Sequence, residues 1–474
     1  MKPEIEHVIV LMLENRSFDS MLGRLYPKLD TFDGLSDDES NSFQGKTYKV
    51  WTTQHDTPSP FTIPTPDPNE DFVDMEEQIY GNDHRPWMGG FVSNYAKANP
   101  TTPGDIMHGF TEAELPVLSQ LAKAFGVSDR WHASTPNQTW PNRFFLHAAT
   151  ALGYLNNSPT HFPYVMPTVF NRMTEAGKSW RIYFHDVPQT ATLANLWSEL
   201  PDHLYRFDEH FELDAKTGHL PNYSFIEPRY FSDPVTGHMP NDQHPPHDVR
   251  YGEQLIATCY NAIRRGPGWE KSLFIIIYDE HGGIYDHVRP PKATPPDDHK
   301  QEGFTFDIFG VRVPAVIISP WIPKGSIIRP PEGGPPYDHT SVIKTLRTLF
   351  GFPKLTNRDE AAPDLMDCLS LPGPSNNGPD RIDPPVKKAT QKEIRQAHAA
   401  PPNGMQKALA HLATNLPKGS APVQAPPSTV PNTAGEALKT AKTGLAGFLK
   451  PGPNHLPAPV APATKSQPTW KPAK

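Results

Sequence analysis

Two adjacent acids, Asp279 and Glu280, follow directly on the apolar run LFIIIY. Acids at the end of a buried strand repel each other unless a cation lies between them or both face solvent. Gly282 and Gly283 permit a tight turn with close backbone approach at this place. The stretch therefore predicts a divalent metal site, and an exposed strand-to-turn transition is the alternative.

A second pair of oxygen donors, Glu14 and Asn15, follows the apolar run HVIVLML. In open α/β sheets, ligands bind at the carboxyl ends of the strands, where both pairs are expected to lie. The alternative is local: Asn15 or Ser17 caps a helix that starts at FDSML, and Glu14 favours its N-terminus.

A candidate nucleophile, Thr139, lies in the stretch STPNQTWPNRFFLHAAT. Pro141 is typical of a first helical turn, so Thr139 is expected just before a helix N-terminus, which favours anions. A hydroxyl there can attack phosphorus if a metal lowers its pKa, and Arg143 would help to hold the developing negative charge. The alternative is a plain capping turn.

Further acids and histidines lie in polar loops. Asp242, His244 and His247 belong to the proline-stiffened segment MPNDQHPPHD, and Asp286 and His287 follow the glycine pair. Such side chains can bind metal or donate hydrogen bonds to phosphate oxygens. Ordinary surface histidines are the alternative.

The elements that must position these residues follow from the apolar pattern. Continuous, β-branched runs predict buried strands at 7–13, 272–279 and 313–320. Helices are expected at 111–125, 142–150, 167–177, 252–265 and 340–351, with His339, before the last, as an outside candidate for the site. The order predicts an α/β sandwich with a mostly parallel central sheet flanked by helices, and functional loops at 52–70 and 285–302.

The chain has 474 residues, of which 57 are prolines, and its composition changes near residue 400. Residues 1–400 are expected to form the catalytic domain. Residues 401–474 contain 14 prolines, eight lysines and one acid, and are predicted to be a disordered tail rich in Pro, Ala and Lys. Within the tail, residues 436–450 are expected to form a basic helix, either transient or docked on a partner or an anionic surface.

Charge and composition exclude several classes of protein. The net charge is -8, and the tail carries about +7, which leaves about -15 on the body; this argues against nucleic acid as a partner. Two cysteines give no disulfide framework. No Sec-type signal peptide or membrane span is recognised, so the expected location is cytoplasmic, or outside the cell after export by a signal-independent route. The oligomeric state stays undefined.

Together the motifs resemble one family. EHVIVLMLENRSFDSMLG, TWPNR, NDQHPPHDVRYGE, IIIYDEHGGIYDHVRPP, FGVRVPAVIISPWI and YDHTSVIKTLRTLFG occur in the order of the phosphoesterase family. This family contains phosphatidylcholine-type phospholipases C and an acid phosphatase, and its fold is similar to that of the alkaline phosphatase superfamily. The resemblance covers residues 4 to 365.

The resemblance implies roles for individual residues. Thr139 matches the nucleophile, and His244 matches a histidine that contacts the substrate phosphoryl group. The four residues that match metal ligands, for Ca, Mg, Mn or Zn, are Glu14, Asn15, Asp279 and Glu280. The residues expected to bind substrate are Arg143, Asp242, Asp286, His287 and Glu70.

One position departs from the family pattern. Relatives often have a histidine where this chain has Glu70, in DPNEDF. A carboxylate cannot donate a hydrogen bond unless it is protonated, so Glu70 is expected to bind a second cation or a choline-like head group.

The expected function is that of a metal-dependent phospholipase C with a phospholipid substrate and peripheral contact with membranes. An acid phosphatase is the first alternative. An inactive body that serves as an interaction protein through its basic tail is the second.

Overall fold

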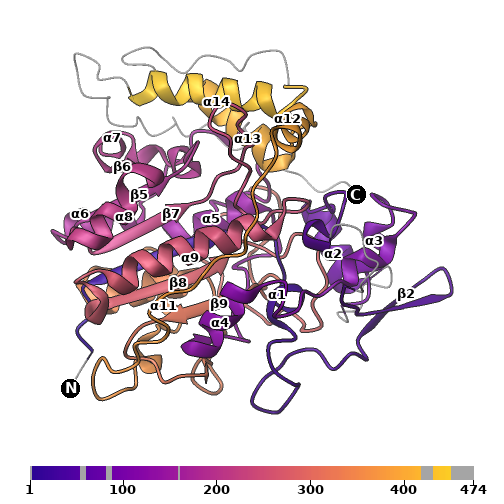
Figure 1. The fold of residues 1–474 in the computed structure, drawn as a ribbon, viewed down its shortest axis with the longest axis horizontal. Helices are drawn as coiled ribbons and strands as arrows, with labels where there is room; N and C mark the ends of the chain where they lie inside the picture. Colours follow the sequence, from indigo (N-terminus) through magenta and orange to yellow (C-terminus); the bar gives the residue numbers. More distant parts are fainter. Residues whose placement is uncertain (1–2, 54–59, 82–87, 159–160, 418–430, 450–474) are drawn as a thin grey trace, which may run out of the picture.

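The computed structural model describes residues 3–53, 60–81, 88–158, 161–417 and 431–449, and its centre is an eight-stranded sheet (Figure 1). The strand order is β10-β4-β9-β8-β1-β7-β5-β6. Five strand pairs of this sheet are parallel, and among its described strands only β9 runs antiparallel to both of its neighbours, β8 and β4. The strands are β1 (His7–Leu13), β4 (Gly126–Val127), β5 (Trp180–Phe184), β6 (Leu204–Arg206), β7 (Tyr223–Glu227), β8 (Ser272–Tyr278), β9 (Ala315–Ile318) and β10 (Ser326–Ile327).

The middle of the sheet is formed by the three strands predicted from sequence. Every residue of β8 and all of β1 after His7 are buried, because both faces of these strands are covered. The predicted strand at 313–320 is confirmed as β9, although it is antiparallel. The α/β fold class, with a mostly parallel sheet flanked by helices, is therefore confirmed.

Helices cover both faces of this sheet. His147 of α5 (Thr139–Ala148) packs on Phe225 of β7, and Phe170 of α6 (Val169–Glu175) packs on Tyr223 of the same strand. On the opposite face, Phe211 of α8 (Phe207–Thr217) packs on Tyr183 of β5. The helix α9 (Val249–Arg265) lies beside α8 across the front of the sheet in Figure 1. In the described ranges, no helix has the length and apolarity needed to cross a membrane.

All five predicted helices are present, with shifted ends. They are α4 (Pro116–Ala124), α5 (Thr139–Ala148), α6 (Val169–Glu175), α9 (Val249–Arg265) and α10 (Thr340–Phe350). The other α-helices of the body are α1 (Phe18–Leu22), α2 (Phe72–Tyr80), α3 (Phe91–Tyr95), α7 (Leu200–His203), α8 (Phe207–Thr217) and α11 (Asn357–Ala361). A hairpin of β2 (Ser40–Phe43) and β3 (Lys46–Lys49) projects from one side.

The prediction of a disordered tail is wrong for two segments. Three C-terminal helices, α12 (Gln391–Ala399), α13 (Gly404–Asn415) and α14 (Ala434–Leu449), form a layer at the top of Figure 1. Leu409 and Phe448 belong to the main hydrophobic core. Prolines between the helices dilute the apolar pattern, but each helix has an apolar face that the body buries. The remaining tail residues, 418–430 and 450–474, lie outside the described residues.

The helix expected at 436–450 is confirmed as α14, and it docks on its own chain. Lys442 Nζ lies 2.5 Å from Asp233 Oδ2 of the body, and Leu445 is buried. One lysine of this helix therefore has an intramolecular partner.

Candidate active site

The two predicted pairs of oxygen donors meet at the carboxyl edge of the sheet. Leu13 pairs with Tyr278 in the parallel register of β1 and β8, so the residues that follow them lie side by side. Asn15 donates from its backbone N–H to Asp279 Oδ1 at 2.9 Å and from its side chain to Glu280 Oε1 at 3.0 Å. These residues and Glu14 are buried.

The turn after β8 needs the glycines that the sequence places there. A Cβ on Gly282 would lie 2.6 Å from the backbone oxygen of Asn15, and the φ of Gly282 is +62°. Asn15 itself has a φ of +45°, a conformation that Asn tolerates better than most residues. The predicted close backbone approach is therefore confirmed.

Thr139 enters the same site from α5. Asn142 fixes the preceding turn, because its Oδ1 accepts from the Thr135 N–H at 3.1 Å and its side-chain amide donates to the Asn137 carbonyl at 2.8 Å. Thr139 is the first residue of the helix rather than the one before it. Its Oγ1 lies 3.4 Å from Glu14 Oε2 and 3.5 Å from Asn15 Oδ1.

Arg143, one turn further along α5, lies among the acids. Its Nη2 donates to Glu14 Oε1, and its Nε lies 3.4 Å from Asp279 Oδ2. The side chain is fully buried. The guanidinium therefore compensates the charge of two acids, whereas the sequence predicted contact with substrate.

The oxygen donors fit a divalent cation. Asp279 Oδ2 is buried and accepts no hydrogen bond in the part of the chain that the structure describes. Burial and the charge of Asp279 raise the pKa of Glu14 well above its usual value, and burial with the charge of Glu70 does the same for Glu280. Buried like charges with oxygen ligands are the arrangement that a hard divalent cation stabilises.

Glu70 reaches the site from the loop before α2. Its Oε2 accepts from the Asn15 side-chain amide at 2.5 Å, and its Oε1 lies 3.8 Å from His244 Nε2. Asp67, which the sequence reasoning missed, lies 3.6 Å from His244 Nδ1. The available signal was a second acid three residues before Glu70 in the same predicted functional loop.

His244 faces these acids. Its Nδ1–H donates to the Pro245 carbonyl at 2.6 Å, and its buried Nε2 has no hydrogen-bond partner among the described residues. Burial alone would lower the pKa of His244, but the charges of Asp67 and Glu70 outweigh it and raise the pKa to about 10. An imidazolium with one unused N–H therefore points into the site.

Asp242 and His247 lie beside this histidine. Asp242 Oδ1 accepts from His247 Nδ1–H at 2.7 Å and from the His244 backbone N–H at 3.2 Å. The Asp242 carbonyl accepts from the Glu14 N–H at 2.9 Å. Asp242 thus connects the loop of His244 to the end of β1.

His339, the outside candidate, supports the end of β8. Its Nε2–H donates to the Asp279 carbonyl at 2.6 Å, and its Nδ1 accepts from Trp131 Nε1–H at 3.4 Å. Burial lowers the pKa of His339 to about 4. A neutral imidazole with both nitrogens engaged acts on the site through the Asp279 backbone.

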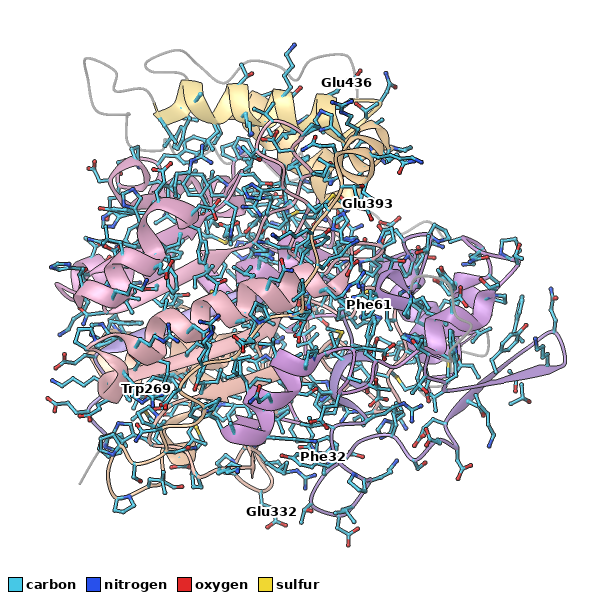
Figure 2. The ribbon with its side chains drawn as sticks, in the orientation of Figure 1. Phe32, Phe61, Trp269, Glu332, Glu393 and Glu436 are labelled. Carbon is cyan, nitrogen blue, oxygen red and sulfur yellow. The ribbon has the colours of Figure 1, made fainter. Side chains whose placement is uncertain are left out.

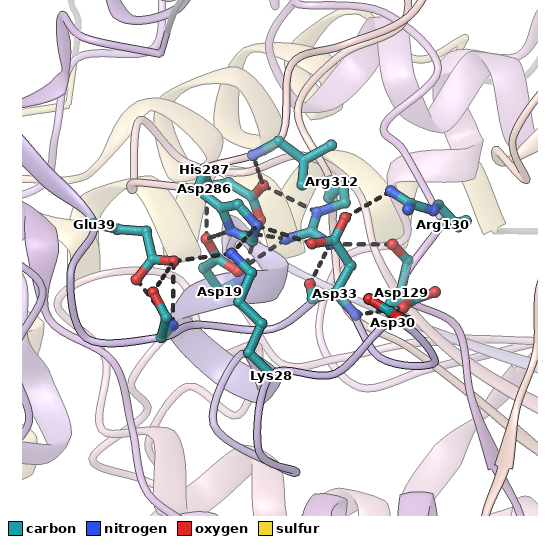
Figure 3. A network of polar contacts seen from close by, with 12 residues as sticks. Asp19, Lys28, Asp30, Asp33, Glu39, Asp129, Arg130, Asp286, His287 and Arg312 are labelled. Atoms are coloured by element: carbon teal, nitrogen blue, oxygen red, sulfur yellow. Dashed lines mark hydrogen bonds and ion pairs between the residues drawn. The ribbon is translucent and has the colours of Figure 1, made fainter.

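Asp286 and His287 belong to a different polar network (Figure 3). Asp286 Oδ1 accepts from Arg312 Nε at 3.0 Å, and His287 Nδ1–H donates to Asp19 Oδ2 at 2.7 Å. Within the described chain, neither residue has a hydrogen bond or ion pair with Thr139 or with the four candidate metal ligands. The structure therefore does not bring these two residues together with the rest of the predicted site.

Comparisons with known proteins identify the family of the chain. The model of the phosphoesterase family matches residues 5–353. Non-specific phospholipase C1 of Arabidopsis thaliana is 38% identical over 75% of this chain and 69% of its own length. Phospholipase C A of Mycobacterium tuberculosis (strain H37Rv) is 28% identical over 82% of each chain.

Among solved structures, a protein in the alkaline phosphatase superfamily from Vibrio parahaemolyticus is 12% identical, covers 77% of this chain and 71% of its own, and has a TM-score of 0.34. A likeness at that level carries no weight for function. The family model and the plant relative decide the assignment: the chain belongs to the phosphoesterase family and is a hydrolase of phosphoric esters.

Proposed function

We propose that the protein is a metal-dependent phospholipase C in which Thr139 is the nucleophile. The observation that carries the proposal is the position of Thr139 Oγ1, at the start of α5 and 3.4 Å from Glu14 Oε2 within a buried set of oxygen donors. Helix N-termini favour phosphate groups through their free N–H groups and dipole. The phospholipase C names of the relatives support a phospholipid substrate.

The candidate metal ligands are Glu14, Asn15, Asp279 and Glu280. A divalent cation bound by them would neutralise phosphoryl charge and lower the pKa of the Thr139 hydroxyl. Ca, Mg, Mn and Zn all accept such ligands to different degrees. Arg143 forms ion pairs with two of the three acids among these ligands, Glu14 and Asp279.

The remaining steps use side chains of the chain itself. Thr139 first loses its hydroxyl proton to solvent, and its Oγ1 alkoxide forms a bond to phosphorus while the bond from phosphorus to the glycerol oxygen breaks. His244 Nε2–H donates its proton to that leaving oxygen. Water then attacks the phosphothreonine diester, Thr139 Oγ1 leaves as the alkoxide, and the neutral His244 accepts the proton of the water.

A paired assay tests the proposal. Protein stripped of metal and reloaded with Ca, Mg, Mn or Zn receives phosphatidylcholine and p-nitrophenyl phosphate in parallel, with Thr139→Ala and Thr139→Ser as variants. Metal-restored release of phosphocholine, reduced by several orders of magnitude in Thr139→Ala and retained in part by Thr139→Ser, is the expected result.

Other outcomes have distinct meanings. Full turnover by Thr139→Ala would contradict the proposed role of Thr139 as the nucleophile. Turnover of the monoester alone would make the protein a phosphatase. Glu70, which replaces a histidine that relatives often have, would then be the candidate cause of this substrate preference. No turnover of either substrate with any of the metals would favour the alternative of an inactive body. The presence of Thr139, His244 and all four oxygen donors opposes that alternative.

A further inference from the structure

A cavity of about 320 Å³ lies between the body and the C-terminal helices. Figure 2 labels Glu393 on α12 and, below it, Phe61 next to Thr62, and both Glu393 and Thr62 line the cavity. Its volume is at the lower end of the range of about 300–1,000 Å³ that ligand pockets occupy. The apolar lining residues are Met239, Pro240, Pro246, Ala397, Ala400 and Pro401.

Hydrogen bonds fix the C-terminal wall of this cavity to the body. Gln406 Nε2 donates to the Tyr230 carbonyl at 2.7 Å, and His398 Nδ1–H donates to the Ser232 carbonyl at 3.1 Å. The wall also reaches the active site, because a Cβ on Gly404 would lie 4.0 Å from Glu70 Oε1 and meet no other atom within 4 Å. The start of α13 therefore lies next to the Glu70 carboxylate.

The charged side chains of the cavity neutralise each other. Arg250 pairs with Asp248 at 2.6 Å, and Lys387 pairs with Glu393 at 3.0 Å. The cavity consequently offers apolar surface and no excess charge of either sign from these four residues. Such a surface suits hydrocarbon better than a phosphate or an ammonium group.

The cavity lies near His244, the proposed general acid. His247 lines it, and the ring centroids of His247 and His244 are 6.0 Å apart. In the cleavage proposed above, the glycerol oxygen leaves and takes its proton from His244. The diacylglycerol end of the substrate must therefore extend from His244 outward, whereas the head group stays on the side of the oxygen donors.

We propose that this cavity binds the diacylglycerol part of the phospholipid, with α12 and α13 as one wall of the subsite. The assignment rests on the proposed phospholipase C reaction. The helices α12 and α13 lie beyond the residues matched by the family model. Under this assignment they contribute to substrate selection. Each methylene group buried there should increase kcat/KM by up to about fourfold.

The test is a chain-length series in wild-type protein and in Ala397→Trp. Short-chain phosphatidylcholines with butanoyl, hexanoyl and octanoyl chains are used below their micellar concentrations. We expect kcat/KM to rise at least about tenfold from butanoyl to octanoyl in the wild type, and this rise to be lost in Ala397→Trp. Ala399→Trp, on the exposed side of the same helix, is the matched control and should keep the rise.

Binding of dioctanoylglycerol, measured by calorimetry, separates this inference from the proposed function. Loss of binding in Ala397→Trp but not in Ala399→Trp supports the subsite even if the wild type releases no phosphocholine, in which case only the proposed reaction fails. A chain-length rise and dioctanoylglycerol binding that both survive in Ala397→Trp overturn the subsite and leave the reaction intact. Ala400→Trp replaces Ala397→Trp if thermal unfolding shows that the latter is misfolded.

Discussion

Glu14 and Asp279 leave adjacent parallel strands side by side, and one guanidinium contacts both. The register of β1 with β8 sets their proximity, and Arg143, from the opposite direction, donates to Glu14 and lies 3.4 Å from Asp279 Oδ2. All three side chains are fully buried. Two ionised acids in such a place depend on compensating positive charge.

Replacing Arg143 by Met should therefore destabilise the protein strongly. Removal of one partner from a buried charge cluster typically costs about 3–5 kcal/mol, because the remaining charges stay uncompensated. Urea unfolding of metal-free wild type and Arg143→Met measures the difference. Arg172→Met, which breaks a half-exposed pair with Glu175, is the control and should cost no more than about 1 kcal/mol. Equal losses in the two variants would contradict the role of Arg143.

The centre of this site could be predicted because its signals are local. A continuous apolar strand followed by two oxygen donors places Glu14, Asn15, Asp279 and Glu280 at one edge of a parallel sheet. Thr139 follows from a proline that marks a helix start. The positions of these residues follow from residue types, strand ends and one helix start.

The remainder depends on contacts between distant segments. Asp67 reaches His244 through a polar loop whose path no periodicity reveals. The sequence predicts Asp286 and His287 as part of the site, but Arg312, 26 residues after Asp286, contacts both of them in a separate network. The helix α13 and the docking of α14 on the body were not predicted, because short apolar faces between prolines become significant only when the body covers them.

A methyl group at Gly282 should disrupt the turn that places Glu280. The added Cβ would approach the Asn15 backbone to 2.6 Å at a positive φ, so backbone must move. We expect Gly282→Ala to lose well over 1 kcal/mol of stability and most metal binding, measured by urea unfolding and by the thermal shift on adding metal. Gly303→Ala is the control, since its φ is +83° with no atom within 4 Å of the new Cβ, and should cost only about 1 kcal/mol. Similar behaviour of both variants would show that backbone conformation alone matters.

Docking of the C-terminal helices should be measurable as stability. Leu409 of α13 is fully buried, so Leu409→Ala should reduce the free energy of unfolding by roughly 2–5 kcal/mol. Leu213→Ala on α8, at a position that is 57% exposed, should change it by about 0.5 kcal/mol or less. An unchanged unfolding midpoint in Leu409→Ala would mean that α13 does not pack on the body in solution.

The network of His287 predicts a pH dependence of stability away from the active site. Burial alone would lower the pKa of His287, but hydrogen bonds to Asp19 and Asp33 outweigh it and raise the pKa to about 9. The same contact holds the pKa of Asp33 well below its usual value. The charged groups around the ring, shown in Figure 3, are Asp19, Asp33, Asp286, Lys28 and Arg312.

Because the folded-state pKa of His287 is raised, its protonation stabilises the folded protein fully below the unfolded value of about 6.5. This contribution is lost as the pH rises through about 9. This contribution is at most about 3–4 kcal/mol, at about 1.4 kcal/mol per pKa unit, and the 13% exposure of the side chain reduces it further. We expect the stability difference between wild type and His287→Asn, followed by urea unfolding, to be largest near pH 6 and to shrink towards about pH 10. A difference that stays constant over this range would show that His287 is neutral in the folded protein and that Arg312 alone balances the acids.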